Sequence, residues 1–311
     1  MDPRAHEWFA RRTTSAADWP LDRVTAAKGA SRVSVVIPAR DEEASVGEVV
    51  RMIRAELMDG AGLVDELVVM DSLSSDSTAE VAAAAGAAVH SVADVAPELG
   101  VLAGKGEALW KSLFVTTGDV LVFIDADLTQ WGTHFVTGLL GPLLADPTTL
   151  LAKGFYDRVL DLGTGVSAEG GRVTELVARP WLALHRPELA AVVQPLAGEW
   201  AIRRSLLETL PTPVGYGVEI ASLLDTAARH GVDAVAQVDL GSRGHKHQSL
   251  HDLGAMAIEL LAVAHRRLTG ETGADVAVLD RLGRDRTWVE REVGTAERPP
   301  ALTVRGYPPP R

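Results

Sequence analysis

The sequence predicts an α/β fold in which a mainly parallel β-sheet is covered by helices on both faces. One observation is that strand-like apolar runs alternate with helical patterns throughout the first 130 residues. Another is that the runs are continuously apolar, as in Val33–Ile37 and Val120–Ile124, instead of alternating with polar residues. This pattern is typical of strands buried on both faces, because neither face meets water.

The expected elements follow one another along the chain. Residues 1 to about 30 look irregular, with Trp8, Phe9 and Trp19 as candidates to pack on the core. The predicted strands are 33–37, 66–70, 88–92, 119–125, 151–156 and 234–240. The predicted helices, which rest on apolar residues at helical spacing, are 42–57, 77–85, 107–116 and 250–268.

Composition restricts the possible classes of function. The chain has 311 residues, 47% of them hydrophobic, and no cysteine, which indicates a globular core without disulfides or thiolate ligands. No stretch reaches the ~20 apolar residues that span a bilayer, and the N-terminus lacks the apolar segment of a signal peptide. The net charge of −12 argues against nucleic acid or an anionic membrane as partner. We therefore expect a soluble cytoplasmic protein.

Polar residues follow three of the predicted strands, in Pro38–Glu42, Asp71–Ser72 and Asp125–Asp127. Ligands of parallel sheets bind beyond the carboxyl ends of the strands, so these clusters indicate a site. Asp125 and Asp127 would point to the same side of an extended chain, where their charges repel unless a cation lies between them. Mg²⁺ and Mn²⁺ suit carboxylate ligands, whereas the simpler alternative is a solvated acidic turn.

A glycine-rich loop at 163–171 opens into a further helical pattern. Glycines before a helix let backbone N–H groups approach an anion, and Arg172 adds a fork suited to phosphate or carboxylate. Arg243 could supply a second cation to a ligand with several negative charges. The alternative is a flexible loop with an ordinary first-turn arginine.

Three segments carry a resemblance to a known fold. No G-x-G-x-x-G motif follows the first strand, and residues 103–107 lack the Ser or Thr of a P-loop. The stretches VSVVIPARDEEASVGEVV, VVMDSLSSDST and VFIDADL instead resemble the nucleotide-sugar-binding half of GT-A glycosyltransferases. In that fold the D-x-D carboxylates hold a divalent ion that bridges the donor diphosphate, so the resemblance implies Mg²⁺ or Mn²⁺ as cofactor.

Longer motifs narrow the resemblance between about Trp19 and about Leu268. GKGEALWKSL, GGRVTELVARP, QPLAGEWA, GYGVEI and AQVDLGSRGHKH are similar to the successive motifs of glucosyl-3-phosphoglycerate synthases. The family implies transfer of glucose from UDP-glucose to the 2-hydroxyl of 3-phosphoglycerate with retention, and we expect a homodimer.

The resemblance also implies a division of the chain. An N-terminal extension at 1–30 precedes a single GT-A (Rossmann-like) domain at 31–270, which ends in a helical extension. Within this domain, residues 31–130 form the nucleotide-sugar half and residues 131–270 the acceptor half. Residues 271–311 are expected to be a flexible C-terminal tail.

Site residues are carried over from the family position by position. The expected donor-binding residues are Pro38, Ala39, Arg40, Glu42, Ser72, Lys105, Asp125 and Ala126. The expected acceptor-binding residues are Gly171, Arg172, Thr174, Arg243 and His247. Asp127 and His245 would bind the metal, Asp127 and Glu219 would be catalytic, and Glu199 and Trp200 would support the sugar pocket. A carboxylate at Glu219 could position or deprotonate the acceptor hydroxyl.

Taken without the family, some of these residues have simpler explanations. A loop histidine such as His245 is more often a surface residue, and Glu219 could be an ordinary acidic residue of a first helical turn. Two positions depart from the family pattern. Ala126 stands where the family often has a hydroxyl-bearing residue, and His247 stands where mycobacterial members have asparagine. The second change puts the acceptor geometry in question.

Other functions fit parts of the sequence. A mannosyl-3-phosphoglycerate synthase or another GT-A transferase with a GDP-sugar donor remains open, because the residues do not separate these donors. A polyprenyl-phosphate sugar transferase is disfavoured by the Arg172 loop and by the lack of a long apolar segment. A catalytically silent GT-A binding protein is disfavoured because Asp127, His245 and Lys105 are all present.

Overall fold

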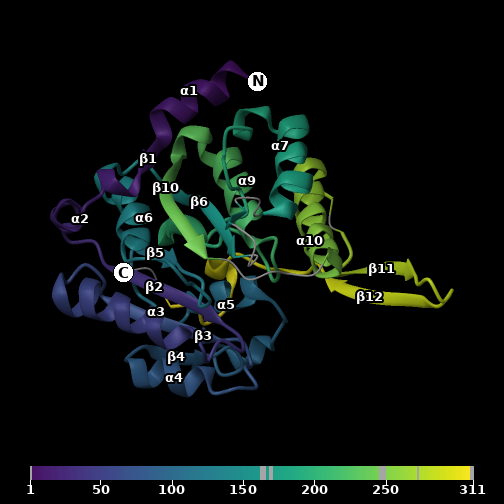
Figure 1. Cartoon of the computed structure of the whole chain (residues 1–311), viewed down its shortest axis with the longest axis horizontal. Helices are drawn as coiled ribbons and strands as arrows, with labels where there is room; N and C mark the ends of the chain where they lie inside the picture. The colour runs from purple at the N-terminus through teal and green to yellow at the C-terminus, as the bar shows by residue number, and fades with distance from the viewer. Residues whose placement is uncertain (1, 162–165, 168–170, 245–249, 272, 309–311) are drawn as a thin grey trace.

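A mixed β-sheet forms the centre of the computed structural model, in which residues 2–161, 166–167, 171–244, 250–271 and 273–308 are described. The strand order is β1-β10-β6-β8-β5-β2-β3-β4, and β7 pairs with the end of β6. The strands are β1 Thr13–Ser15, β2 Val33–Ala39, β3 Glu66–Asp71, β4 Ala88–Ser91, β5 Val120–Phe123, β6 Leu151–Asp161, β7 Val166–Ser167, β8 Trp200–Arg203 and β10 Val235–Gly244. Figure 1 shows this sheet between helices.

Parallel pairing dominates the sheet, as the sequence predicted. β2 pairs in parallel with β3 and β5, β3 with β4, and β10 with β6 and β1. The exceptions among the described strands of this sheet are β8, which lies antiparallel between β5 and β6 and places Trp200 opposite Phe123, and the short β7, which is antiparallel to β6. The sequence analysis missed β8 because it has only four residues.

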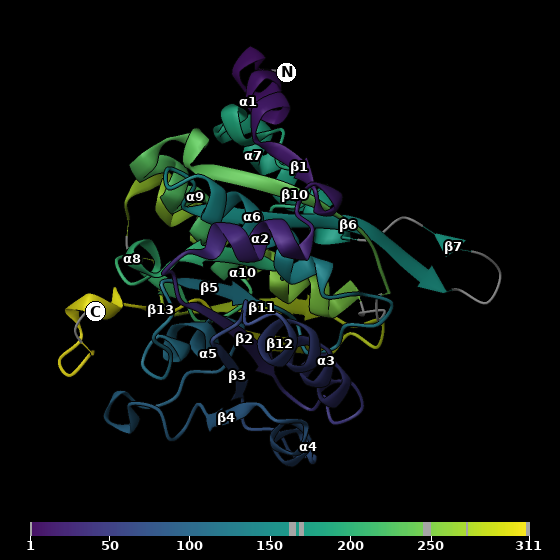
Figure 2. The ribbon, with the colours of Figure 1, turned by 90° about the vertical axis from the view of Figure 1, so that its left-hand side faces the viewer.

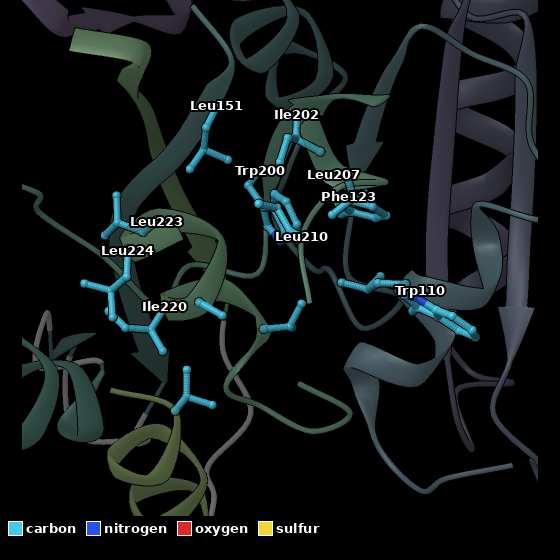
Figure 3. Packing of buried hydrophobic residues seen from close by; sticks show 14 of the residues in the cluster. Trp110, Phe123, Leu151, Trp200, Ile202, Leu207, Leu210, Ile220, Leu223 and Leu224 are labelled. Carbon is cyan, nitrogen blue, oxygen red and sulfur yellow. The ribbon is translucent and has the colours of Figure 1, made fainter. Parts of the chain in front are cut away.

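Helices cover both faces of the sheet and enclose two hydrophobic clusters. One cluster contains apolar residues of α5, α9 and α10 (Figure 3), and the other contains residues of α2, α3 and α6. The helices are α2 Leu21–Lys28, α3 Val46–Ile53, α4 Thr78–Ala85, α5 Lys105–Ser112, α6 His134–Ala145, α7 Arg179–His185, α8 Arg204–Leu207, α9 Val218–His230 and α10 Leu250–Thr269. In the described part of the chain, no helix combines the length and apolar character needed to cross a bilayer.

The N-terminal 30 residues are regular, where the sequence suggested irregular chain. Helix α1, Pro3–Arg12, begins with Asp2 as its N-cap and proline in its first turn, which are strong start signals. Trp8 is fully buried and its indole Nε1 donates to the carbonyls of Val232 (3.0 Å) and Val235 (3.1 Å). The helix was missed because only Ala5 and Trp8 of its residues are buried, so its apolar periodicity is weak.

Residues 276–304 also contain defined structure, where the sequence predicted a flexible tail. Strands β11, Val276–Leu282, and β12, Trp288–Gly294, form an antiparallel hairpin that projects from the body beside α10 (Figure 1). Strand β13, Glu297–Arg298, then pairs with β9, Thr212–Pro213. The chain ends near the side of the molecule formed by α8 (Figure 2). Contacts with residues distant in sequence order this segment, and local patterns do not reveal such contacts.

Candidate active site

Two loops at the carboxyl ends of neighbouring strands are held together by hydrogen bonds from their backbones and side chains. After β3, the Ser72 N–H donates to the carbonyl of Ala39 at the end of β2 (2.8 Å). The carboxylate of Asp41 accepts from the Ser75 N–H (2.7 Å), and the Glu42 N–H donates to Thr78 Oγ1 (2.8 Å). The predicted donor-binding residues of these loops, which therefore lie together, are Pro38, Ala39, Arg40, Glu42 and Ser72.

Asp125 and Asp127 follow β5, which ends at Phe123, two residues earlier than the sequence predicted. The chain turns at Ala126 and Asp127 and is no longer extended. The carboxylates of Asp125 and Asp127 nevertheless meet at one guanidinium. Arg243 Nη1 donates to Asp125 Oδ2 (3.2 Å), and Arg243 Nη2 donates to Asp127 Oδ1 (3.1 Å). The cation expected between the two aspartates is thus provided here by a side chain.

Arg243 is enclosed by further partners below the aspartates. It contacts the fully buried carboxylate of Glu199, donates to the Tyr156 hydroxyl (3.1 Å) and lies 5.4 Å from the centre of the Tyr156 ring. The Tyr156 hydroxyl donates to the other oxygen of Glu199 (2.6 Å). Arg243 was expected to bind the acceptor, but its guanidinium organises the acidic residues in this structure.

Lys105 connects the aspartates to Glu219. Its Nζ lies 2.6 Å from Asp125 Oδ1 and 2.9 Å from Glu219 Oε1. Burial opposes the charge of Lys105, but the adjacent carboxylates outweigh burial and raise the lysine pKa well above its ordinary value. Burial likewise disfavours the charge of Asp125 and raises its pKa. The neighbouring Lys105 and Arg243 outweigh burial, so the pKa of Asp125 lies below its ordinary value. Both groups are therefore ionised at neutral pH.

The charges of the site leave room for a divalent cation. Four carboxylates surround two cationic side chains. The carboxylates are those of Asp125, Asp127, Glu199 and Glu219, and the cations are Lys105 and Arg243. At full ionisation they leave a net charge of −2, which a divalent ion would neutralise. Asp125 and Asp127 keep 22% and 25% of their side chains exposed, so both can reach a ligand. This oxygen-rich, partly open donor set fits Mg²⁺ or Mn²⁺.

The proposed histidine ligand cannot be placed. His245 and His247 both lie outside the described residues. Within the described part of the chain, no group of three or more His, Asp or Glu side chains has a geometry suited to holding a metal ion. Of the two expected metal ligands, Asp127 is therefore the one that lies among the described residues.

The expected acceptor residues begin a helical segment, as the sequence suggested. Gly171 has a φ of 84°, which favours glycine, and its carbonyl accepts from the Glu175 N–H (2.9 Å). Arg172 is half-buried in the first turn, and Thr174 is buried at the start of a π-helical turn, Thr174–Ala178. The side chains of residues 158–170, which precede this turn, lie outside the description.

Lys153 is a site residue that the sequence analysis missed. It is fully buried on β6, its Nζ donates to the carbonyl of Ala197 (2.8 Å), and it lies 5.5 Å from the centre of the Trp200 ring. Burial lowers its pKa to about 7. A lysine inside the apolar run LLAKGFY was the available signal. Through its bond to Ala197, Lys153 holds the loop that contains Gly198. Gly198 packs closely on Asp125, because an added Cβ there would lie 2.3 Å from Asp125 Oδ2.

Known proteins share this architecture and are similar in sequence over most of the chain. Residues 34–209 match the family described as Glycosyl transferase family 2. The chain is 45% identical to the glucosyl-3-phosphoglycerate synthase of Mycolicibacterium smegmatis, over 96% of this chain and 99% of that protein. It is 51% identical to the glucosyl-3-phosphoglycerate synthase of Mycobacterium tuberculosis (strain ATCC 25618 / H37Rv), over 78% and 76%.

Solved structures with bound ligands are similar as well. One is the M. tuberculosis glucosyl-3-phosphoglycerate synthase in complex with Mn²⁺, UDP-glucose and phosphoglyceric acid. It has a TM-score of 0.84 and 45% identity, covering 94% of this chain and 99% of that chain. Another holds Mn²⁺, UDP and glucosyl-3-phosphoglycerate, with a TM-score of 0.82 and 45% identity over 92% and 96%.

Proposed function

The chain belongs to glycosyl transferase family 2 and to its glucosyl-3-phosphoglycerate synthases, and we propose that it transfers glucose from UDP-glucose to the 2-hydroxyl of 3-phosphoglycerate. The observation that carries this proposal is the identity of 45% over nearly the full length of both chains. A relative's crystal contains the product glucosyl-3-phosphoglycerate together with UDP and Mn²⁺. The acidic cluster of this chain lies at the sheet edge where an α/β fold binds ligands.

Asp127 and His245 would hold the divalent ion, and Asp125 would face the ribose of the donor. When bound, the ion offsets the negative charge that develops on the leaving diphosphate. The protein's own contribution is to keep Asp125 ionised and fixed through Lys105 and Arg243. Fixed charges of this kind need no rearrangement when the reaction occurs.

We propose retention of configuration through a same-face reaction in which the leaving diphosphate helps to deprotonate the acceptor. Retention by a protein nucleophile would require a carboxylate able to attack the sugar. Among the described residues, the four carboxylates of the site are each paired with Lys105 or Arg243, and we assign none of them the role of nucleophile. Glu219, whose carboxylate lies 2.9 Å from Lys105 Nζ, is suited to accept a hydrogen bond from the acceptor hydroxyl and so to orient it.

The acceptor is proposed to bind at Gly171, Arg172 and Thr174. 3-Phosphoglycerate carries a phosphate in addition to the carboxylate that it shares with glycerate, so the phosphate distinguishes the two acceptors. A polar site rejects an analogue that lacks the expected partner by as much as ~10⁴-fold. Strong preference for 3-phosphoglycerate over glycerate is therefore part of the proposal, and His247 would complete the acceptor site.

The test is turnover of the purified protein with Mn²⁺, UDP-glucose and 3-phosphoglycerate, corrected for hydrolysis of the donor. The glycosidic configuration of the product is measured by NMR, and GDP-glucose, GDP-mannose and glycerate serve as competing substrates. We expect an α-linked product, loss of turnover in Asp127→Ala with an unchanged fold, and loss of turnover after chelation. Equal efficiency with GDP-mannose or with glycerate would overturn the proposed substrates.

A homodimer in the cytoplasm completes the proposal. The paired strands β11 and β12 carry Val276, Val278, Leu282 and Trp288 on one exposed face, because Leu282 lies opposite Trp288. A two-stranded hairpin is marginally stable when one face stays in water. A second copy of the chain could cover this face. The cytoplasm is proposed because both substrates are charged phosphorylated metabolites.

A further inference from the structure

The C-terminal strand β13 is connected through β9 to the first turn of α5, the helix that carries Lys105. The first turn of α5 lies against β9 so closely that a Cβ on Gly106 would come 1.8 Å from the Pro213 carbonyl oxygen. The Glu107 N–H donates to the Val214 carbonyl (2.9 Å). On its other edge, the same segment of chain pairs with β13, and the Val214 N–H donates to the Ala296 carbonyl (3.1 Å). The position of α5 therefore depends on β13.

Arg298 of β13 adds a direct connection through its side chain. Its Nε and Nη2 donate to the two carboxylate oxygens of Glu107, both at 2.7 Å. Its Nη1 donates to the Leu99 carbonyl (2.9 Å), and its Nη2 also reaches the Gly100 carbonyl (3.1 Å). A bidentate, charge-assisted pair of this kind fixes orientation as well as distance. One guanidinium thus holds the first turn of α5 and the loop that precedes it.

A second buried cation supports the same arrangement. Lys111, one turn after Glu107 on α5, is fully buried and lies 3.5 Å from the Glu107 carboxylate. Its Nζ donates to the carbonyls of Val92 (2.6 Å) and Gly100 (2.8 Å). The Glu107 carboxylate therefore lies between two cations that also bind the 92–100 loop.

Lys105 and Glu107 are two residues apart in the same helical turn. Side chains at this spacing point in different directions around a helix. Lys105 points to Asp125 and Glu219 in the candidate active site, whereas Glu107 points to Arg298. A shift of Glu107 would rotate or displace the turn and carry Lys105 with it.

We propose that Arg298 is a positioning residue for glucosyl transfer, which acts through Glu107 to set the place of Lys105 beside Asp125 and Glu219. This inference rests on the proposed function. Segment 271–311 then contributes to the donor side of the reaction, although none of its described residues contacts the acidic cluster. Displacing a catalytic group by about 1 Å can cost roughly 100-fold in rate.

The experiment compares steady-state kinetics of the full-length chain with those of Arg298→Gln and Glu107→Gln. We expect kcat/KM for UDP-glucose to fall about 10- to 100-fold in both variants, while KM for 3-phosphoglycerate stays within about twofold. The double variant should be no worse than either single variant, because the two residues act as one unit. Multiplying effects in the double variant would overturn the mechanism.

Arg267→Gln is the matched control. Arg267 contacts Glu297, the neighbour of Arg298 in β13, and anchors this strand to Asp225 of α9 without reaching Glu107. It should lower the thermal midpoint while kcat/KM for UDP-glucose stays within about twofold of the wild type. An equal kinetic loss in Arg267→Gln, or none in Arg298→Gln, would show that β13 has only a structural role.

If Arg298→Gln does not fold, Arg298→Lys decides the question, since it keeps the cation and removes the bidentate fork. The same selective loss for UDP-glucose supports the proposal, and wild-type kinetics contradict it. Wild-type turnover with UDP-glucose and 3-phosphoglycerate is measured first. If the wild type does not turn over these substrates, the proposed function is wrong. The role of Arg298 is tested separately by the ratio of kcat/KM between each variant and the wild type, measured with the nucleotide sugar that the wild type uses.

Discussion

Arg243 illustrates what single residues reveal before a structure is known. The spacing of Asp125 and Asp127 suggested a divalent metal ion between the two carboxylates, whereas the structure places the Arg243 guanidinium against both of them. Sequence alone assigned this arginine to the acceptor, because its contacts with Glu199 and Tyr156 join strands far apart in the chain. Local patterns identified the charges of the site but not which charges pair.

Arg172 provides the first residue-scale prediction. Arg172→Ala should raise KM for 3-phosphoglycerate about ten- to a hundred-fold, because one charge-assisted bond to a phosphate contributes about 1.5–3 kcal/mol. KM for UDP-glucose should change little. Steady-state kinetics with each substrate varied in turn give both constants. Equal changes in the two would assign Arg172 a structural role.

Lys153 leads to a prediction on pH and stability. The lysine pKa is lowered to about 7 in the folded protein, chiefly by burial, while Glu219, Glu199 and Asp125 raise it and Lys105 lowers it. In the unfolded chain it is about 10.4. Between these values the unfolded state binds the extra proton, so this group makes stability rise with pH by up to about 1.4 kcal/mol per unit.

Lys153→Met should remove this rise. Denaturant unfolding of both proteins at pH 7 to 10 measures the difference in the free energy of unfolding. The free energy of unfolding of Lys153→Met minus that of the wild type should be larger at pH 7 than at pH 10. The lost bond to Ala197 adds an offset that does not depend on pH, so parallel curves would show that Lys153 stays charged.

Elements were predictable where their apolar pattern is local. The parallel strands β2, β3 and β5 stand out because each is buried on both faces. Strand β8 was missed because its four residues are too few to show an apolar period. Helix α1 was missed because only two of its side chains are buried. Their positions depend on partners elsewhere in the chain, such as the pairing of β8 with β5 and β6.

Helix α5 supports a prediction at the scale of elements. Alanine normally stabilises a helix interior relative to glycine by about 1 kcal/mol. Gly106→Ala should instead destabilise the protein by about 1–3 kcal/mol, because its Cβ would collide with the backbone of Pro213. Gly254→Ala in α10 is the control, since its nearest added contact is 3.9 Å away and stability should increase. Thermal unfolding measures both, and a stabilised Gly106→Ala would mean that α5 does not press on β9.

The assembly of the whole molecule is tested at the hairpin. Trp288 has 68% of its surface exposed and lies opposite Leu282 on the face proposed to contact a second copy. Trp288→Ser should weaken the dimer at least about 30-fold, because buried interface tryptophans often contribute 2 kcal/mol or more. Sedimentation velocity across a concentration series gives the dissociation constant.

Leu184→Ser is the control for that experiment, since Leu184 is also largely exposed but lies on α7, outside the hairpin. It should leave the dissociation constant unchanged. A monomeric wild type at all concentrations, or equal dissociation constants for wild type and Trp288→Ser, would contradict the proposed interface.

The three residues of β1 cover the outer margin of strand β10. Thr13, Thr14 and Ser15 pair with Gln237, Val238 and Asp239 of β10, at the outer margin of the sheet. A chain cleaved by a protease after Pro20 would leave these backbone groups unpaired and expose the groove vacated by Trp8. An open strand margin next to newly exposed apolar surface is a template for aggregation. Shortened versions of the chain should therefore precipitate before they lose the chemistry of the site.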